Sequence, residues 1–137
     1  MASILKVDTI TGVTTAGSIA VTGEGNSTTT NLQQGLAKAW INLNGLASGA
    51  AARDSFNTSG TVDNGTGNYT VTLSNNLSNA NYATPATVGN TDRGRYGTLS
   101  DSDSKSTSAA VFFGFQTSTG DALDPAEYSI VFHGDLA

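Results

Sequence analysis

The chain has 137 residues, a net charge of −5 and no cysteine. This length predicts one main domain, and the absence of cysteine excludes disulfides and thiolate metal sites. The six Lys and Arg residues are scattered along the chain, which argues against nucleic-acid binding. Ser, Thr, Asn and Gly together make up 63 residues, and this composition predicts strands joined by many turns rather than helices.

Residues 1–30 have a period that differs from the rest of the chain. Apolar residues recur there at every third position, namely Ile4, Val7, Ile10, Val13, Ala16 and Ile19. A period of three matches neither a helix face nor a simple strand. One interpretation is an extended segment packed around a threefold axis, and the other is two short strands, 4–10 and 18–22, joined by a turn at 12–17. Both leave too few apolar groups for a core, so we expect an extended N-terminal arm that anchors or trimerises the protein.

A short helix is expected directly after this arm. Thr30 or Asn31 can cap it, and four apolar side chains then fall on one helical face, at Leu32, Leu36, Ala39 and Trp40. Gly35 weakens this helix by roughly 1 kcal/mol relative to alanine. We expect Trp40 to be a packing anchor at the junction between the helix and the first strand.

Residues 31–137 are expected to form an all-β domain, an antiparallel β-sandwich of six to eight short strands. Apolar and polar side chains alternate in Trp40–Asn44 and Tyr69–Leu73, which predicts strands with one buried face. Asn64-Gly65 predicts a hairpin turn between 61–63 and 69–73, because both residues accept positive φ. The other expected strands lie near Phe56, at 84–88, at 95–99 within a long exposed loop of residues 89–108, at 110–116 in the centre of a sheet, and at 128–133.

The sequence offers little for catalysis or for a cofactor. His133 is the single histidine, and no Gly-x-Ser-x-Gly motif accompanies it, so a structural role is expected. Asp101-Ser102-Asp103 and the acidic turn 121–124 could supply oxygen ligands to Ca²⁺, but the first lacks the glycine and distal glutamate of a calcium loop, and solvated acidic turns are expected. Gly65-Thr66-Gly67 lacks the lysine and the strand-to-helix context of a phosphate loop. We therefore expect a protein that is not an enzyme and that has no metal and no cofactor.

Targeting signals are equally scarce. The chain has no apolar run near the ~18 residues of a membrane span, and its first residues lack the charged start and apolar core of a signal peptide. We expect a protein that is synthesised in a cytoplasm and does not insert into a membrane.

Several segments together resemble a β-sheet module of fibre and other virion proteins of tailed bacteriophages, especially marine ones. The segments that carry this resemblance are Leu5-Lys6-Val7-Asp8-Thr9-Ile10, Trp40–Asn44, Arg53–Phe56, Asp63–Leu73 and Asn79–Tyr82. The resemblance implies a non-enzymatic β-domain of a trimeric appendage and brings no catalytic residues with it. Because the chain starts at its own Met1 and is short, a small separate subunit is expected: a head fibre, a capsid decoration protein or a short tail fibre.

The expected function is therefore that of a virion surface protein, made in the host cytoplasm and forming a homotrimer. Its N-terminal arm is expected to attach to other capsid or tail proteins. The residues expected to carry assembly are Ile4, Val7, Ile10, Ile19, Val21, Leu32, Leu36 and Trp40. The alternative is a carbohydrate-binding module that recognises host-surface glycans. The residues expected to contact a glycan in that case are Tyr82, Arg93, Arg95 and Tyr96.

Overall fold

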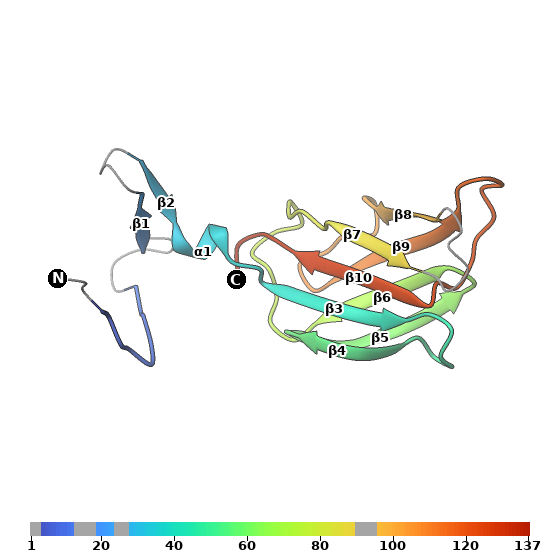
Figure 1. The fold of residues 1–137 in the computed structure, drawn as a ribbon, viewed down its shortest axis with the longest axis horizontal. Helices are drawn as coiled ribbons and strands as arrows, with labels where there is room; N and C mark the ends of the chain where they lie inside the picture. Colours follow the sequence, from blue (N-terminus) through green and yellow to red (C-terminus); the bar gives the residue numbers. More distant parts are fainter. Residues whose placement is uncertain (1–3, 13–18, 24–27, 90–95) are drawn as a thin grey trace. The chain divides into compact units, whose positions relative to one another are not determined.

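The computed structural model describes residues 4–12, 19–23, 28–89 and 96–137. The chain divides into two compact units, Met1–Leu36 and Ala37–Ala137, and Figure 1 shows the elements of each. The domain boundary expected after residue 30 thus lies six residues before the observed division.

The N-terminal unit contains one small hairpin and one helical turn. Strands β1 (Ala20–Thr22) and β2 (Thr29–Asn31) pair in antiparallel register, and α1 (Leu32–Gly35) follows. Asn31 caps this helix, as one of the two residues expected to do so: its Oδ1 accepts a hydrogen bond from the Gln34 backbone N–H at 3.1 Å.

Two expectations for this unit are wrong. The strand at the expected position 18–22 pairs with β2 rather than with residues 4–10, and the described residues 4–12 contain no strand. The helix ends at Gly35 and does not reach Ala39 or Trp40, which belong to strand β3. Glycine is a poor helix former. From Ala39 onward the chain pairs with β10 as a strand, and this pairing outweighs the helical spacing of the apolar residues.

The second unit is a sandwich of two four-stranded antiparallel sheets, which confirms the expected all-β sandwich. The first sheet has the order β4-β3-β10-β7 and the second the order β5-β6-β9-β8. The strand bounds are β3 Ala39–Asn44, β4 Ala51–Phe56, β5 Thr58–Gly65, β6 Asn68–Leu73, β7 Ala86–Gly89, β8 Tyr96–Asp101, β9 Ala109–Gln116 and β10 Glu127–Phe132. The apolar segment expected in the centre of a sheet is β9, which lies between β6 and β8.

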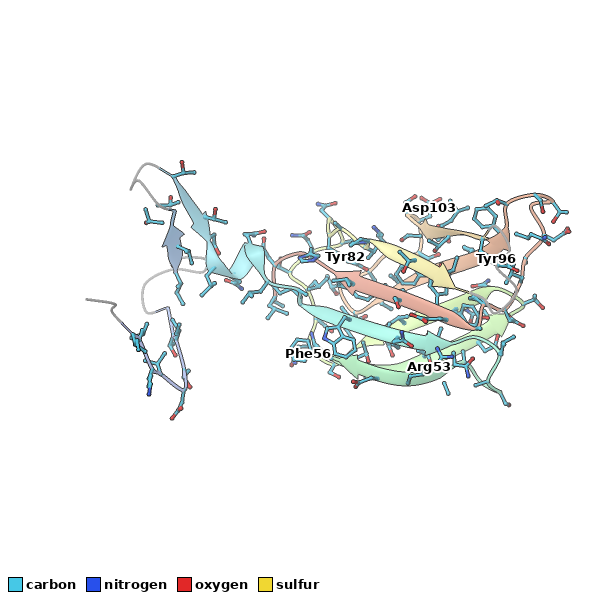
Figure 2. The ribbon with its side chains drawn as sticks, in the orientation of Figure 1. Arg53, Phe56, Tyr82, Tyr96 and Asp103 are labelled. Carbon is cyan, nitrogen blue, oxygen red and sulfur yellow. The ribbon has the colours of Figure 1, made fainter. Side chains whose placement is uncertain are left out.

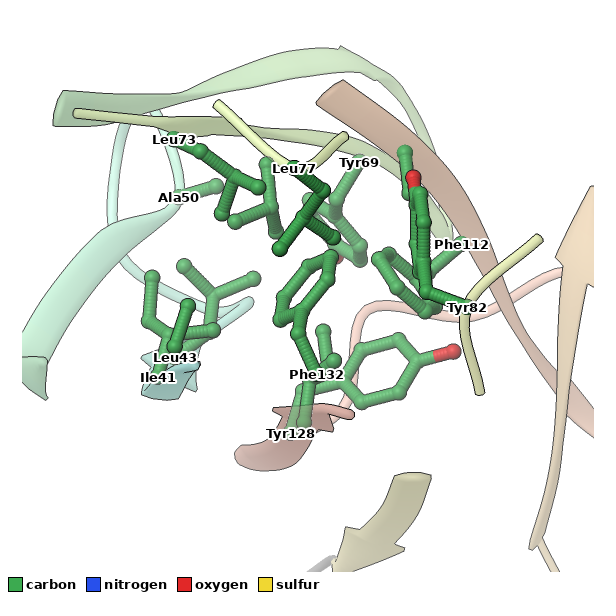
Figure 3. Packing of buried hydrophobic residues seen from close by; sticks show 14 residues of the cluster. Ile41, Leu43, Ala50, Tyr69, Leu73, Leu77, Tyr82, Phe112, Tyr128 and Phe132 are labelled. Carbon is green, nitrogen blue, oxygen red and sulfur yellow. The ribbon is translucent and has the colours of Figure 1, made fainter. Parts of the chain in front are cut away.

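The core lies between the sheets and comes mainly from the inward positions of the four central strands, and connecting segments add Ala50, Leu77 and Tyr82. The side chains of the central strands alternate between buried and partly exposed, as a period of two requires. Four aromatic rings form a series of contacts across the interface (Figure 3). Tyr69 meets Tyr128 edge-on with centroids 6.1 Å apart, and Phe112 meets both Tyr128 and Phe132 at 6.1 and 6.0 Å. Such edge-to-face pairs add to the burial energy of the rings.

The sandwich has two distinct ends. At one end, called the entry end, β3 begins and β10 finishes: the Lys38 backbone N–H donates to the Phe132 carbonyl at 2.8 Å (Figure 1). The C-terminal residues stay at this end, because Ala137 N donates to the Asn76 carbonyl at 3.1 Å. The opposite end, called the loop end, carries the connections β3–β4, β5–β6 and β9–β10.

Three residues of the β9–β10 connection, Leu123–Pro125, close the loop end. The Asp124 carboxylate accepts hydrogen bonds from Gly67 N at 2.7 Å and from the Tyr69 hydroxyl at 2.5 Å. The Pro125 carbonyl accepts one from Gly45 N at 3.0 Å. Gly67 and Tyr69 belong to the second sheet and its turn, whereas Gly45 follows β3 of the first sheet. This connection therefore ties both sheets together.

The β5–β6 hairpin is present where Asn64-Gly65 predicted it, but its turn differs from the expectation. Positive φ occurs at Gly65 and Gly67, at 124° and 70°, and not at Asn64. Asn64 remains in β5, where its side-chain amide donates to Thr70 Oγ1 at 2.8 Å. A Cβ at Gly67 would meet the Gly114 carbonyl at 2.4 Å, so both the backbone angle and the packing require glycine there.

The close packing at Gly45 gives a first test. A Cβ at this position would meet the Tyr69 hydroxyl at 2.6 Å and the Pro125 carbonyl at 2.7 Å. Gly45→Ala is therefore expected to lower the free energy of unfolding by about 1–3 kcal/mol through overpacking, measured by chemical denaturation. The matched control is Gly60→Ala on β5, where the nearest atom to the new Cβ is Thr72 Oγ1 at 3.6 Å. Equal stability of the two variants would contradict the role of Leu123–Pro125 as the closure.

Alkaline titration gives a second test. Burial raises the pKa of Tyr128 to about 12, and burial together with the Asp124 carboxylate raises the pKa of Tyr69 above its ordinary value. Below pH 10 both phenols are protonated in the folded and the unfolded chain, so their contribution to the free energy of unfolding is fully present. Above pH 10 the unfolded chain ionises first, and each such tyrosine lowers stability by about 1.4 kcal/mol per pH unit.

Denaturant unfolding between pH 8 and about 11.5 is expected to show this loss, and Tyr128→Phe is expected to make the slope against pH shallower. Absorbance near 295 nm reports ionised phenol in the same samples. A wild-type stability that stays constant through this range would contradict the buried, protonated state of these two rings.

Candidate functional site

The first candidate surface is the N-terminal unit, whose aliphatic side chains are largely exposed. Six of them keep more than half of their surface accessible: Ile4, Leu5, Val7, Ile10, Val21 and Leu36. Of the other three residues expected to act in assembly, Ile19 and Leu32 are partly exposed, and Leu32 N donates to the Ile19 carbonyl at 2.8 Å. All fourteen buried hydrophobic residues that the structure describes lie between positions 39 and 132. The described part of this unit therefore has no core.

Trp40, the third of these residues, belongs to the sandwich and not to the N-terminal unit. It lies on β3 between the buried Ala39 and Ile41, so its side chain takes the outer face of the first sheet. Its cross-strand partners are Phe56 on β4 and Val131 on β10. Phe56 is 54 % exposed. The three side chains form an apolar row across the outer face, near the entry end.

A polar network adjoins this row on the same face. Asn42 Nδ2 donates to Glu127 Oε1 and to Ser129 Oγ, each at 3.1 Å, and Asn42 Oδ1 accepts from Arg53 at 3.1 Å. Arg53 also donates to the carbonyls of Leu43 and Ala126. The guanidinium thus holds β4 to β3 and to the end of the β9–β10 connection. Figure 2 shows Arg53 and Phe56 along the same edge of the sandwich.

A β-bulge explains why Arg53 reaches this face. Asn42 pairs with Asp54 and Leu43 with Ala52, so Arg53 is the extra residue in β4. A bulge re-aims a side chain and strengthens the local twist. It also interrupts the regular hydrogen-bonding edge of β4, which opposes pairing with a further strand. No local pattern around Arg53-Asp54 predicted this bulge.

The structure places Tyr82 in the core, so the expectation that it is exposed for glycan contact is wrong. Tyr82 is 5 % exposed, and its hydroxyl donates to the carbonyls of Ser106 and Ala109 at 3.0 and 2.9 Å. Its ring packs on Phe132, and Lys105 Nζ lies 5.2 Å from the ring centroid. Burial raises its pKa. The surrounding Asn and Ala residues suggested a loop, but long-range packing holds this loop against the sandwich.

The other glycan candidates lie elsewhere. Tyr96 starts β8 at the loop end, while Tyr82 lies near the entry end (Figure 2). Tyr96 shares the inward-facing positions of β8 with Thr98, which bonds the buried Tyr128 hydroxyl. Arg93 and Arg95 lie outside the described residues. The structure therefore does not bring Tyr82 and Tyr96 together.

The outer face of the second sheet carries a shallow apolar hollow. Its volume is about 380 Å³, and its lining comes from Leu99, Phe113, Gly114, Phe115, Gly120 and Ala122. The Phe115 ring lies against Gly97, where a Cβ would meet ring atoms at 2.5 Å. This hollow offers apolar contact and little hydrogen bonding, so it differs in chemistry from the Trp40 face.

The single histidine and the acidic residues expected to be structural lie in ordinary backbone and turn contacts. His133 N and the Ala83 carbonyl form a bridge at 2.9 Å beyond the end of β10. No cluster of three or more His, Asp or Glu side chains occurs among the described residues. Asp101 instead makes a local turn, accepting from Asp103 N and Ser104 Oγ, which lowers the pKa of its carboxyl group.

Comparisons add no relative. No family model, no curated protein and no solved structure matches the chain. Within the described residues the one helix has four residues, which is far too short to cross a membrane.

Proposed function

We propose that the protein is a non-enzymatic structural subunit of a bacteriophage virion, exposed on the particle surface and assembled as a homotrimer. In this proposal residues 1–36 attach the subunit to its copies and to capsid or tail proteins, and the sandwich is the exposed body. The bacteriophage assignment is supported by the sequence resemblance alone, and the assembly role is supported by the structure of the two units.

The observation that carries the assembly role is the set of exposed aliphatic side chains in a unit without a core. Ile4, Leu5, Val7 and Ile10 lie within seven consecutive residues, and all are more than half exposed. Burying such side chains stabilises a protein by about 1.5–3 kcal/mol each. A segment that leaves this energy unused in the single chain gains it by packing against other chains.

The sandwich, in contrast, supplies its own core and its own closure. The buried residues and the Leu123–Pro125 connection all lie within Ala37–Ala137. The covalent link to residues 1–36 leaves at the entry end, where the C-terminal residues also bond to the Asn76 carbonyl. The loop end is therefore free of both chain ends of the sandwich, which suits a body attached through one end.

Deletion of residues 1–36 tests the assembly role. The remaining sandwich keeps its core, so it is expected to fold and to be monomeric, whereas the full chain is expected to be a trimer by sedimentation equilibrium. Circular dichroism and thermal unfolding verify that the truncated chain is folded. A folded sandwich that retains the oligomeric state of the full chain would overturn the role given to residues 1–36.

Point variants in the full chain separate apolar burial from chain length. Ile4→Ser, Val7→Ser and Ile10→Ser together are expected to dissociate the oligomer without changing the melting of the sandwich. The matched control changes the exposed neighbours Thr9 and Thr11 to Ser. It alters the same segment and removes two methyl groups, but it leaves every aliphatic residue in place. Dissociation by both sets of changes would contradict a specific role for the aliphatic residues.

A further inference from the structure

We propose that the outer face of the first sheet binds a neutral saccharide, with Trp40 and Phe56 as the stacking surface and Arg53, Asp54 and Glu127 as hydrogen-bonding groups. This surface is called the Trp40 face. The proposal goes beyond the assembly role and does not depend on it, because all five residues belong to the sandwich.

The stacking surface is made by a cross-strand pair on two rigid strands. Trp40 and Phe56 are direct partners in the β3–β4 register, and both side chains take the outer face. Phe56 is 54 % exposed and Trp40 is partly exposed, so the pair presents adjoining aromatic surface to a ligand. The C–H-bearing face of a pyranose is apolar and flat, and it packs well on an exposed aromatic ring.

The polar part of the surface is held in place before any ligand arrives. Arg53 is fixed by Asn42 and by the carbonyls of Leu43 and Ala126, and Glu127 Oε1 accepts from Asn42 and Ser129. In the described structure Asp54 Oδ1 accepts only from Ser55 N, at 2.8 Å. One oxygen of Asp54 and one of Glu127 are left for a ligand. Fixed polar groups bind with a smaller loss of conformational entropy than mobile ones.

The charges on this face favour a neutral polyol over the other ligand classes. One guanidinium lies among two carboxylates, so the face offers donors and acceptors together with a formal charge of −1. A sugar hydroxyl both donates and accepts, and it therefore matches this mixture. An anionic ligand meets two carboxylates, and a purely apolar protein surface would strip water from Asp54 and Glu127 without replacing its hydrogen bonds.

The single tryptophan of the chain makes the test direct, since Trp40 is itself the reporter. Titration of the full chain with glucose, galactose, mannose, N-acetylglucosamine and their oligomers is expected to shift or quench its emission with at least one neutral sugar. Galacturonate and sialic acid, as anionic probes, are expected to bind more weakly. No response to any neutral sugar at millimolar concentrations would overturn the proposal.

Variants then assign the response to this face. Phe56→Ala and Asp54→Asn are each expected to weaken binding by about tenfold. Leu99→Ala, on the outer face of the second sheet and 59 % exposed, is the matched control and is expected to bind as the wild type does. Binding that survives both face variants but is lost in Tyr96→Ala would place the site at the loop end and overturn the proposal.

A protein partner is the competing occupant, and the same reporter distinguishes it. If the Trp40 face contacts a second copy, emission changes with protein concentration in the absence of sugar, and Phe56→Ala abolishes that change. This outcome would also overturn the saccharide proposal. Loss of the oligomer on deletion of residues 1–36, with sugar binding intact, would leave both the assembly role and the saccharide site standing.

Discussion

The architecture of the sandwich depends on the hydrogen bonds that the Asp124 carboxylate accepts. This carboxylate joins the β5–β6 turn and the Tyr69 hydroxyl to the β9–β10 connection, and the next residue bonds Gly45 after β3. Asp124 is partly buried, and losing these two donors would leave its carboxylate with poorer hydrogen bonding than in water. The surrounding glycines, Gly45 and Gly67, have no space for a side chain, so this closure fixes the spacing of the two sheets at the loop end.

The same closure organises the face proposed to bind sugar. Ala126 follows the Leu123–Pro125 segment directly, and its carbonyl accepts from Arg53. Glu127 then begins β10 and bonds Asn42. The positions of Arg53 and Glu127 on the Trp40 face are therefore set by the connection that joins the sheets. Rigidity of the fold and preorganisation of this surface have a common physical origin, which places the site on strands rather than on mobile loops.

Sequence patterns predicted the sandwich well where the signal was local. The alternation in Tyr69–Leu73 and the apolar run 110–116 both became central strands, because one buried face leaves a period of two in the sequence. The prediction that the helix reaches Trp40 is wrong, because pairing of this segment with β10 outweighs the helical spacing of its apolar residues. Burial of Tyr82 and the contacts of Asp124 depend on residues 24 to 57 positions away, and no local pattern encodes them.

The two units differ in how they obtain their stability, and the roles proposed for them rest on this difference. β3 and β10, the first and last strands of the sandwich, are neighbours in the middle of one sheet, so its core is completed only when the whole of Ala37–Ala137 is in place. Such non-local pairing makes folding slow, and the described core residues all come from this one unit. Residues 1–36 have a hairpin of three-residue strands, which is marginal alone. In the proposed assembly the ordering of residues 1–36 is coupled to association, and the Trp40 face keeps its geometry because it is built from the sandwich alone.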